Sequence, residues 1–93
     1  MELPVNYNGL TQNQRRLVRE KYIKLQEGKC SHCGNHLSQR ATDEVMKKPI
    51  DKSLFPSGFF KHLVHLHHNH VTGMTIGAVH CRCNAVLWQY NGI

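Results

Sequence analysis

HLHHNHVTGMTIGAVHCRCN, residues 65–84, combines a cluster of histidines, a glycine-containing turn and a close pair of cysteines. Upstream, aromatic and β-branched residues alternate loosely with polar ones from Gly58 to His68, which favours a strand. Residues 69–73 contain asparagine and glycine, which are typical of a turn, and MTIGAV at 74–79 suits a returning strand. The stretch therefore predicts a β-hairpin that leads directly into the cysteine pair.

Two helices are expected to flank the hairpin. Residues 11–27, TQNQRRLVREKYIKLQE, repeat their apolar side chains at spacings near three and four, the period of an amphipathic helix. Thr11 is a suitable N-cap, and Gly28 stands where a left-handed residue often ends a helix. A second, short helix is expected over residues 84–90. Its side chains expected to pack inward are Val86, Leu87 and Trp88.

The length and composition predict one small, soluble domain. Ninety-three residues build only a thin core, and no apolar run approaches the roughly 20 residues that cross a bilayer. The four cysteines follow no apolar signal stretch, so we expect reduced thiols, metal binding rather than disulfides, and a cytoplasmic location. Residues 38–57 are polar, contain two prolines and predict an irregular connection with one helical turn before Pro49.

Two separated pairs of side chains are candidate ligands of a structural zinc ion. Cys30 and Cys33 form a C-x-x-C knuckle over residues 30–36, and HCRC supplies further donors about 50 residues later. Tetrahedral zinc needs four ligands, so two of the later donors suffice. We favour His80 with Cys83, because their spacing matches a knuckle, and keep Cys81 as the alternative to His80. This zinc would staple the hairpin to the final helix, because metal-binding free energy becomes folding free energy.

Basic residues outnumber acidic ones. Twelve Lys and Arg against six Asp and Glu give a formal charge of +6, which fits a polyanionic partner such as DNA, although basic charge also serves solubility alone. Side chains on the basic helix and near the hairpin could meet backbone phosphates. The candidate DNA-binding residues are Arg15, Arg16, Arg19, Lys61 and Arg82.

The knuckle at residues 30–33, the histidines at 65–70, the Gly73 turn and GAVHCRCN at 77–84 together resemble the HNH, or ββα-metal (His-Me finger), nucleases. Within that family the closest similarity is to the small endonucleases like phage endonuclease VII. The resemblance spans roughly residues 30–88. It implies an α+β fold: one domain over residues 1–93, with a zinc-stapled ββα-metal core at residues 59–91 and an N-terminal helix.

The resemblance also implies roles for individual residues. His67 and Asn84 would hold a catalytic divalent cation, His68 would be the general base, and His70 matches a further active-site histidine. His65 matches a preceding histidine of the family. The implied catalytic cation is Mg²⁺ or Mn²⁺. Because the first ligand is an imidazole, Ni²⁺ or Co²⁺ should also support activity.

Two positions depart from the family pattern. His80 stands where the family has a cysteine, and Leu87 replaces a glutamate that some relatives carry, so a preference for DNA junctions is not implied. Adjacent strand residues point to opposite faces, so His67 and His68 can act together only where the strand ends or bulges.

These features predict a metal-dependent DNA endonuclease with little sequence preference, acting as a monomer or homodimer, in the host cytoplasm if the chain is phage-encoded. An imidazole with a pKa around 6.5 can take a proton from water, and a cation can neutralise charge on the phosphate. Two other functions are also consistent with these sequence features. One is a non-catalytic zinc module that binds nucleic acid or protein, and the other is a histidine-rich metal store.

Overall fold

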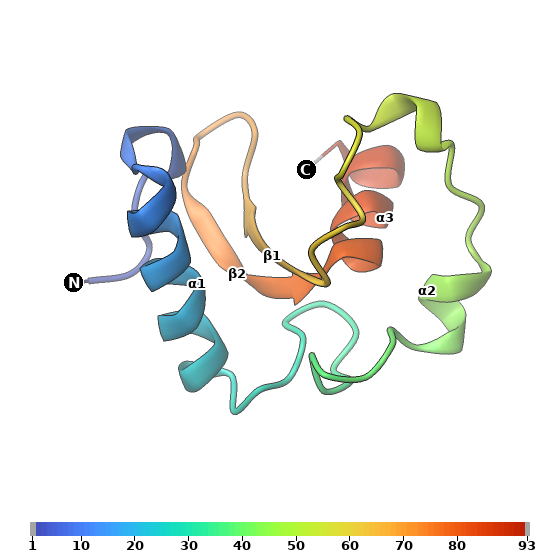
Figure 1. The fold of residues 1–93 in the computed structure, drawn as a ribbon, viewed down its shortest axis with the longest axis horizontal. Coiled ribbons are helices and arrows are strands. Elements are labelled where there is room, and N and C mark those ends of the chain that lie inside the picture. The colour runs from blue at the N-terminus through green and yellow to red at the C-terminus, as the bar shows by residue number, and fades with distance from the viewer. Residues whose placement is uncertain (1, 93) are drawn as a thin grey trace.

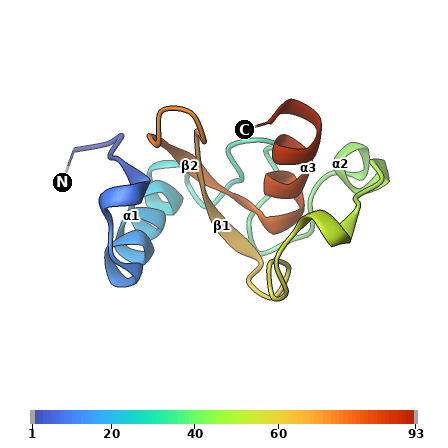
Figure 2. The same cartoon turned by 90° about the horizontal axis from the view of Figure 1, so that it is seen from above.

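A two-stranded antiparallel hairpin stands between two helical parts of the molecule in the computed structural model, which describes residues 2–92. Strand β1 (Val64–His68) pairs with β2 (Thr75–His80). Helix α1 (Gln12–Leu25) lies on one side, and α3 (Cys81–Asn91) lies on the other with the short α2 (Asp43–Lys47), as Figures 1 and 2 show from two directions. The arrangement confirms an α+β fold.

Short helical turns complete the described part of the chain. The 3-10 helix η1 (Tyr7–Gly9) precedes α1, and η2 (Lys52–Leu54) follows α2. Helix α2 is the turn predicted before Pro49, and most of the remaining connection is irregular, as expected. None of the helices among these residues is both long and apolar enough to span a membrane.

Helix α1 begins where its sequence predicts and ends at Leu25, two residues before the predicted end. The hydroxyl of Thr11 accepts from the backbone of Gln14, whose side chain in turn accepts from the Thr11 N–H, so both ends of a capping box are present. At the other end Gly28 has a φ of 76°, the left-handed conformation that a glycine adopts without strain.

Strand β1 is shorter than predicted, and the final helix starts earlier. Residues 58–63 form turns, with N–H groups of Phe59 and Lys61 bonded to carbonyls three residues back. The physical reason is the partner strand: β2 ends at His80, opposite Val64, and the chain becomes helical at the next residue. Residues before Val64 therefore have no strand left to pair with.

The core lies on both sides of the hairpin. Val18 and Tyr22 of α1 pack with hairpin residues, while Val86 of α3 packs with residues of the connection. The predicted inward packing of Leu87 is confirmed, but that of Trp88 is wrong, since Trp88 is 39% exposed. At about 100° per residue, three consecutive helical positions cannot all face one core.

The side chain of Gln26 joins the end of α1 to the free edge of β2. Its amide nitrogen donates to the carbonyl of Ala78 and its oxygen accepts from the N–H of Ala78, both at 2.9 Å. Gly77 permits this approach, because a Cβ there would lie 2.9 Å from the Gln26 oxygen and 2.8 Å from the Ser31 hydroxyl. The edge strand thus gains a partner that satisfies its backbone groups.

Replacing Gln26 by alanine should lower the free energy of unfolding by about 1–3 kcal/mol, because the part-buried N–H of Ala78 loses its acceptor and the Ala78 carbonyl keeps only the bond from the Ser31 N–H. Urea denaturation of the zinc-loaded protein measures the change. Gln12→Ala, at an exposed position of α1, is the matched control and should change stability by less than about 0.5 kcal/mol. Equal stability of the two variants would contradict this role of Gln26.

Candidate functional site

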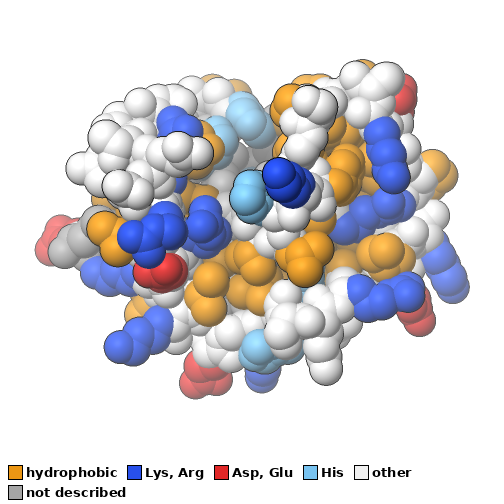
Figure 3. Space-filling view, viewed as in Figure 1, with side chains coloured by type: hydrophobic (Ala, Val, Ile, Leu, Met, Phe, Trp, Pro, Cys, Tyr) orange, Lys and Arg blue, Asp and Glu red, His pale blue; other side chains and the backbone are white. Residues whose placement is uncertain are grey.

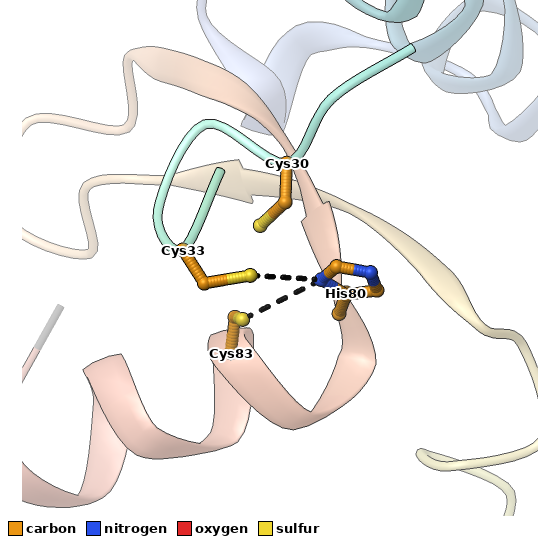
Figure 4. Close-up of side chains that lie close together, drawn as sticks. All are labelled: Cys30, Cys33, His80 and Cys83. Carbon is orange, nitrogen blue, oxygen red and sulfur yellow. Dashed lines mark hydrogen bonds between the residues drawn. The ribbon is translucent and has the colours of Figure 1, made fainter. Parts of the chain in front are cut away.

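Four side chains from two distant parts of the chain converge on one point. Cys30 and Cys33 come from the knuckle, while His80 ends β2 and Cys83 lies in the first turn of α3. Their ligand atoms all lie within 4.8 Å of one another, and Figure 4 shows the three sulfurs and the imidazole pointing inward. This Cys3His group can hold a metal ion.

The spacing of the donor atoms fits tetrahedral zinc. Nδ1 of His80 lies 3.4 Å from the sulfur of Cys33 and 3.6 Å from that of Cys83. Zinc bonds of about 2.3 Å to sulfur and about 2.0–2.1 Å to nitrogen give tetrahedral edges of about 3.5–3.8 Å. The group therefore needs little rearrangement to surround the ion.

The imidazole of His80 is oriented as a ligand by a hydrogen bond on its far side. Its Nε2 lies 3.0 Å from the carbonyl oxygen of His36, which can only accept, so Nε2 carries the hydrogen. Nδ1 is then left with its lone pair directed at the sulfurs. Such a second hydrogen bond commonly fixes the tautomer of a metal-binding histidine.

The thiols of Cys30 and Cys83 are electrostatically coupled. A hydrogen bond from Cys83 lowers the pKa of Cys30 to about 3, against the opposing effect of burial. The same bond, together with burial, raises the pKa of Cys83. Two thiolates this close repel each other, so the pair keeps a shared proton. A divalent cation removes that repulsion, since metal ligands bind as thiolates.

Cys81 stands apart from this group. Its side chain is buried and lines a separate cavity with Met46 and Leu63, and burial raises the pKa of its thiol. His80 and Cys83 are three residues apart at the start of a helix and face the same side, whereas Cys81 is turned away. His80, and not Cys81, therefore belongs to the group that could hold a metal ion, and all four cysteines in the described residues are free thiols.

A second candidate site adjoins the metal-binding group. It is a cavity of about 310 Å³ between the hairpin, the start of α3, α1 and the N-terminal segment. Figure 3 shows this face hollowed near its upper edge, with histidine side chains in the hollow and Lys and Arg side chains beside it. The polar and aromatic side chains that line the cavity are Tyr7, Arg19, Phe59, His62, His65, His68, His70 and Asn84.

Asn84 is placed in this cavity by its position directly after Cys83. Its amide nitrogen donates to Nδ1 of His65 at 3.1 Å. Phe59 packs edge-on against the same imidazole with ring centroids 4.6 Å apart. Burial is the main cause that lowers the pKa of His65, so its ring is neutral at neutral pH and can bind a metal.

His68 is held in a stack of rings. The register of the strand pair shifts between His67 and His68, which meets the condition under which these two neighbours can act together. The His68 ring lies parallel to Tyr7 with centroids 3.8 Å apart, and the Arg15 guanidinium lies 3.9 Å from the same Tyr7 ring. Since His68 already covers one face of Tyr7, Arg15 covers the other.

The environment of His68 favours its neutral form. Burial, the neighbouring His70 and Arg15 together lower the pKa of His68. His70 is exposed and meets the His68 ring edge-on at 4.6 Å. A neutral imidazole next to an open cavity can accept a proton from water.

The structure brings some predicted residues into the cavity and leaves others elsewhere. His68, His70 and Asn84 line it, whereas His67 is only 5% exposed and is absent from the lining. The histidine hydrogen-bonded to Asn84 is His65, which the resemblance gave no defined role. Sequence reasoning missed Tyr7 altogether, because no motif marks a residue that reaches the hairpin from the start of the chain.

The predicted DNA-binding residues lie in different parts of the structure. Arg15, Arg16 and Arg19 line a basic cavity of about 420 Å³ beside the histidine cavity. Lys61 is exposed and lines neither the basic cavity nor the histidine cavity. Arg82 donates to the carbonyls of Met46 and Lys48, so its guanidinium holds the end of α2.

The chain matched no protein-family model, no curated protein and no solved structure when it was compared with each. The resemblance to HNH nucleases therefore depends on the sequence motifs alone.

The purified protein should contain one zinc ion per chain, as measured by mass spectrometry of the metal after dialysis. Cys33→Ser should lose the ion and melt at a lower temperature, because metal binding contributes directly to folding. Cys81→Ser removes a thiol outside the donor group and is the matched control. Zinc retained by Cys33→Ser and lost by Cys81→Ser would contradict the assignment.

Proposed function

We propose that the protein is a metal-dependent endonuclease that hydrolyses phosphodiester bonds in DNA. The observation that carries the proposal is the placement of Asn84, beside the Cys3His group, in one cavity with His65, His68 and His70. The order of two strands followed directly by a helix is also the order that the resemblance implies. Both features agree with the resemblance to the HNH nucleases.

His68 is the proposed general base. Its ring is neutral near pH 7, faces the cavity and is kept from rotating by the stack with Tyr7. A base of this kind takes the proton from the water that attacks phosphorus. Tyr7 would act as a positioning residue, since it touches the base.

Asn84 and a histidine are the proposed ligands of the catalytic cation, which would neutralise charge on the phosphate. The resemblance nominates His67, but the geometry favours His65, which lines the cavity and already contacts Asn84. An imidazole nitrogen with an amide oxygen suits Mn²⁺, Co²⁺ or Ni²⁺ better than Mg²⁺, which prefers oxygen ligands.

The basic cavity supplies a place for the DNA backbone. It shares Tyr7, Arg19 and His62 with the histidine cavity, so a strand whose scissile phosphate lies at the histidines can place neighbouring phosphates against the arginines. Phosphate contacts of this type fix position without reading sequence, which agrees with the low specificity proposed.

Nicking of supercoiled plasmid in the presence of Mn²⁺ tests the proposal. His68→Ala should reduce the rate by about 10²-fold or more, the usual contribution of a general base. His32→Ala removes an exposed histidine of the knuckle that lines none of the described cavities, and should leave the rate unchanged. Absence of nicking by the zinc-loaded wild-type protein would instead support a non-catalytic binding module.

A comparison of two histidine variants identifies the ligand of the catalytic cation. His65→Ala should raise the Mn²⁺ concentration for half-maximal nicking by about tenfold or more, since loss of even an indirect partner weakens metal binding 10–100-fold. His67→Ala, at a buried position, should mainly lower the melting temperature. If His67→Ala raises the Mn²⁺ requirement and His65→Ala does not, His67 is the ligand of the catalytic cation.

A further inference from the structure

An aromatic cavity of about 270 Å³ opens next to the proposed active site. Its walls are Leu54, Phe55, Pro56, Phe59 and Trp88, and it shares Phe59, His70 and Asn84 with the histidine cavity. The cavity lies between the segment that follows η2 and the outer side of α3. Aromatic rings therefore stand directly beside the proposed catalytic groups.

The rings form a connected cluster around Phe55. Its ring centroid lies 4.7 Å from that of Phe59 and 5.4 Å from that of Trp88, which it meets edge-on. Phe59 in turn contacts the imidazole of His65. The cluster therefore reaches from α3 to the hairpin.

These rings are not enclosed in the core. Leu54 is 48% exposed and Trp88 is 39% exposed, so the cavity presents apolar surface to water. An exposed apolar patch on a small protein commonly marks a binding site. Phe60 also contacts the ring of Phe55. The ammonium group of Lys52 lies 5.7 Å from the centroid of the Phe60 ring, so a cation stands beside the aromatic cluster.

The three cavities are thus spatial neighbours, with the histidine cavity between the other two. The arginine cavity adjoins the histidine cavity through Tyr7, Arg19 and His62, and the histidine cavity adjoins the aromatic one through shared lining residues. Positive charge stands at both ends, from the three arginines and from Lys52. A polyanion that carries flat apolar groups matches this order.

We propose that the aromatic cavity binds an unpaired base of the DNA substrate, next to the scissile phosphate. The inference rests on the proposed function and adds the substrate class: single-stranded DNA, or duplex DNA with an extrahelical nucleotide. A base inside a duplex is stacked on both faces and offers only its edges, so only an unpaired base can present a face to Phe55 or Trp88. Stacking on an aromatic side chain changes affinity on the order of tenfold per base.

Trp88 is the only tryptophan of the chain, so its fluorescence reports occupation of the cavity without any cleavage. Three DNA probes are titrated into the wild-type protein without added divalent cation: a paired duplex, the same duplex with one unpaired adenosine, and the same duplex with an abasic residue at that position. The unpaired adenosine should quench Trp88 and bind about tenfold more tightly than either other probe.

Trp88→Ala tests the cavity itself, with affinity measured by anisotropy of labelled DNA. The preference for the unpaired base should fall by about tenfold. Leu25→Ala also removes an exposed apolar side chain, 65% exposed at the end of α1, and should keep the preference. Circular dichroism shows whether both variants are folded.

The outcomes separate this inference from the proposed hydrolysis. Equal binding and equal quenching by all three probes would overturn it, as would an unchanged preference in Trp88→Ala, even if the plasmid is nicked. Selective quenching by the unpaired base, lost in the abasic probe, would support it even if the protein nicks no plasmid.

Discussion

The convergence of three sulfurs and one imidazole on a single point is the constraint that positions the rest of the molecule. It joins the knuckle to the place where β2 becomes α3, and Asn84 follows its last member, Cys83. The direction of the Asn84 side chain, and with it the wall of the histidine cavity, therefore depends on this group. A metal ion held by this group would give a domain with so thin a core a rigidity that apolar packing alone would not supply.

The opposite wall of the histidine cavity depends on hydrogen bonds between residues that lie far apart in the sequence. The N–H of Tyr7 donates to the carbonyl of Gly73, and the N–H of Thr75 donates to the carbonyl of Val5, so the start of the chain lies along the hairpin. Tyr22 of α1 bonds the Thr75 hydroxyl from within the core. These contacts place the Tyr7 ring against His68, so the N-terminal segment forms part of the histidine cavity.

The three adjoining cavities differ in the chemical character of the side chains that line them. Guanidinium groups at one end suit phosphates, neutral imidazoles in the middle suit proton transfer and metal binding, and aromatic rings at the other end suit the face of a base. Burial and neighbouring positive charge both lower the pKa of His65 and of His68, so both favour the neutral imidazoles. The positive charge of Arg15 and Arg16 thus lies outside the histidine cavity.

The features that sequence reasoning predicted are those encoded over a few neighbouring residues. The N-cap at Thr11, the left-handed Gly28 and the spacing of His80 with Cys83 are local features, so the sequence of a few residues is enough to predict them. The ends of β1 and α3, the exposure of Trp88, the approach of His65 to Asn84 and the arrival of Tyr7 at His68 were decided by the tertiary structure. Each depends on strand register or on contacts between segments far apart in the chain, and the free energy of such contacts is set by packing partners that no local pattern names.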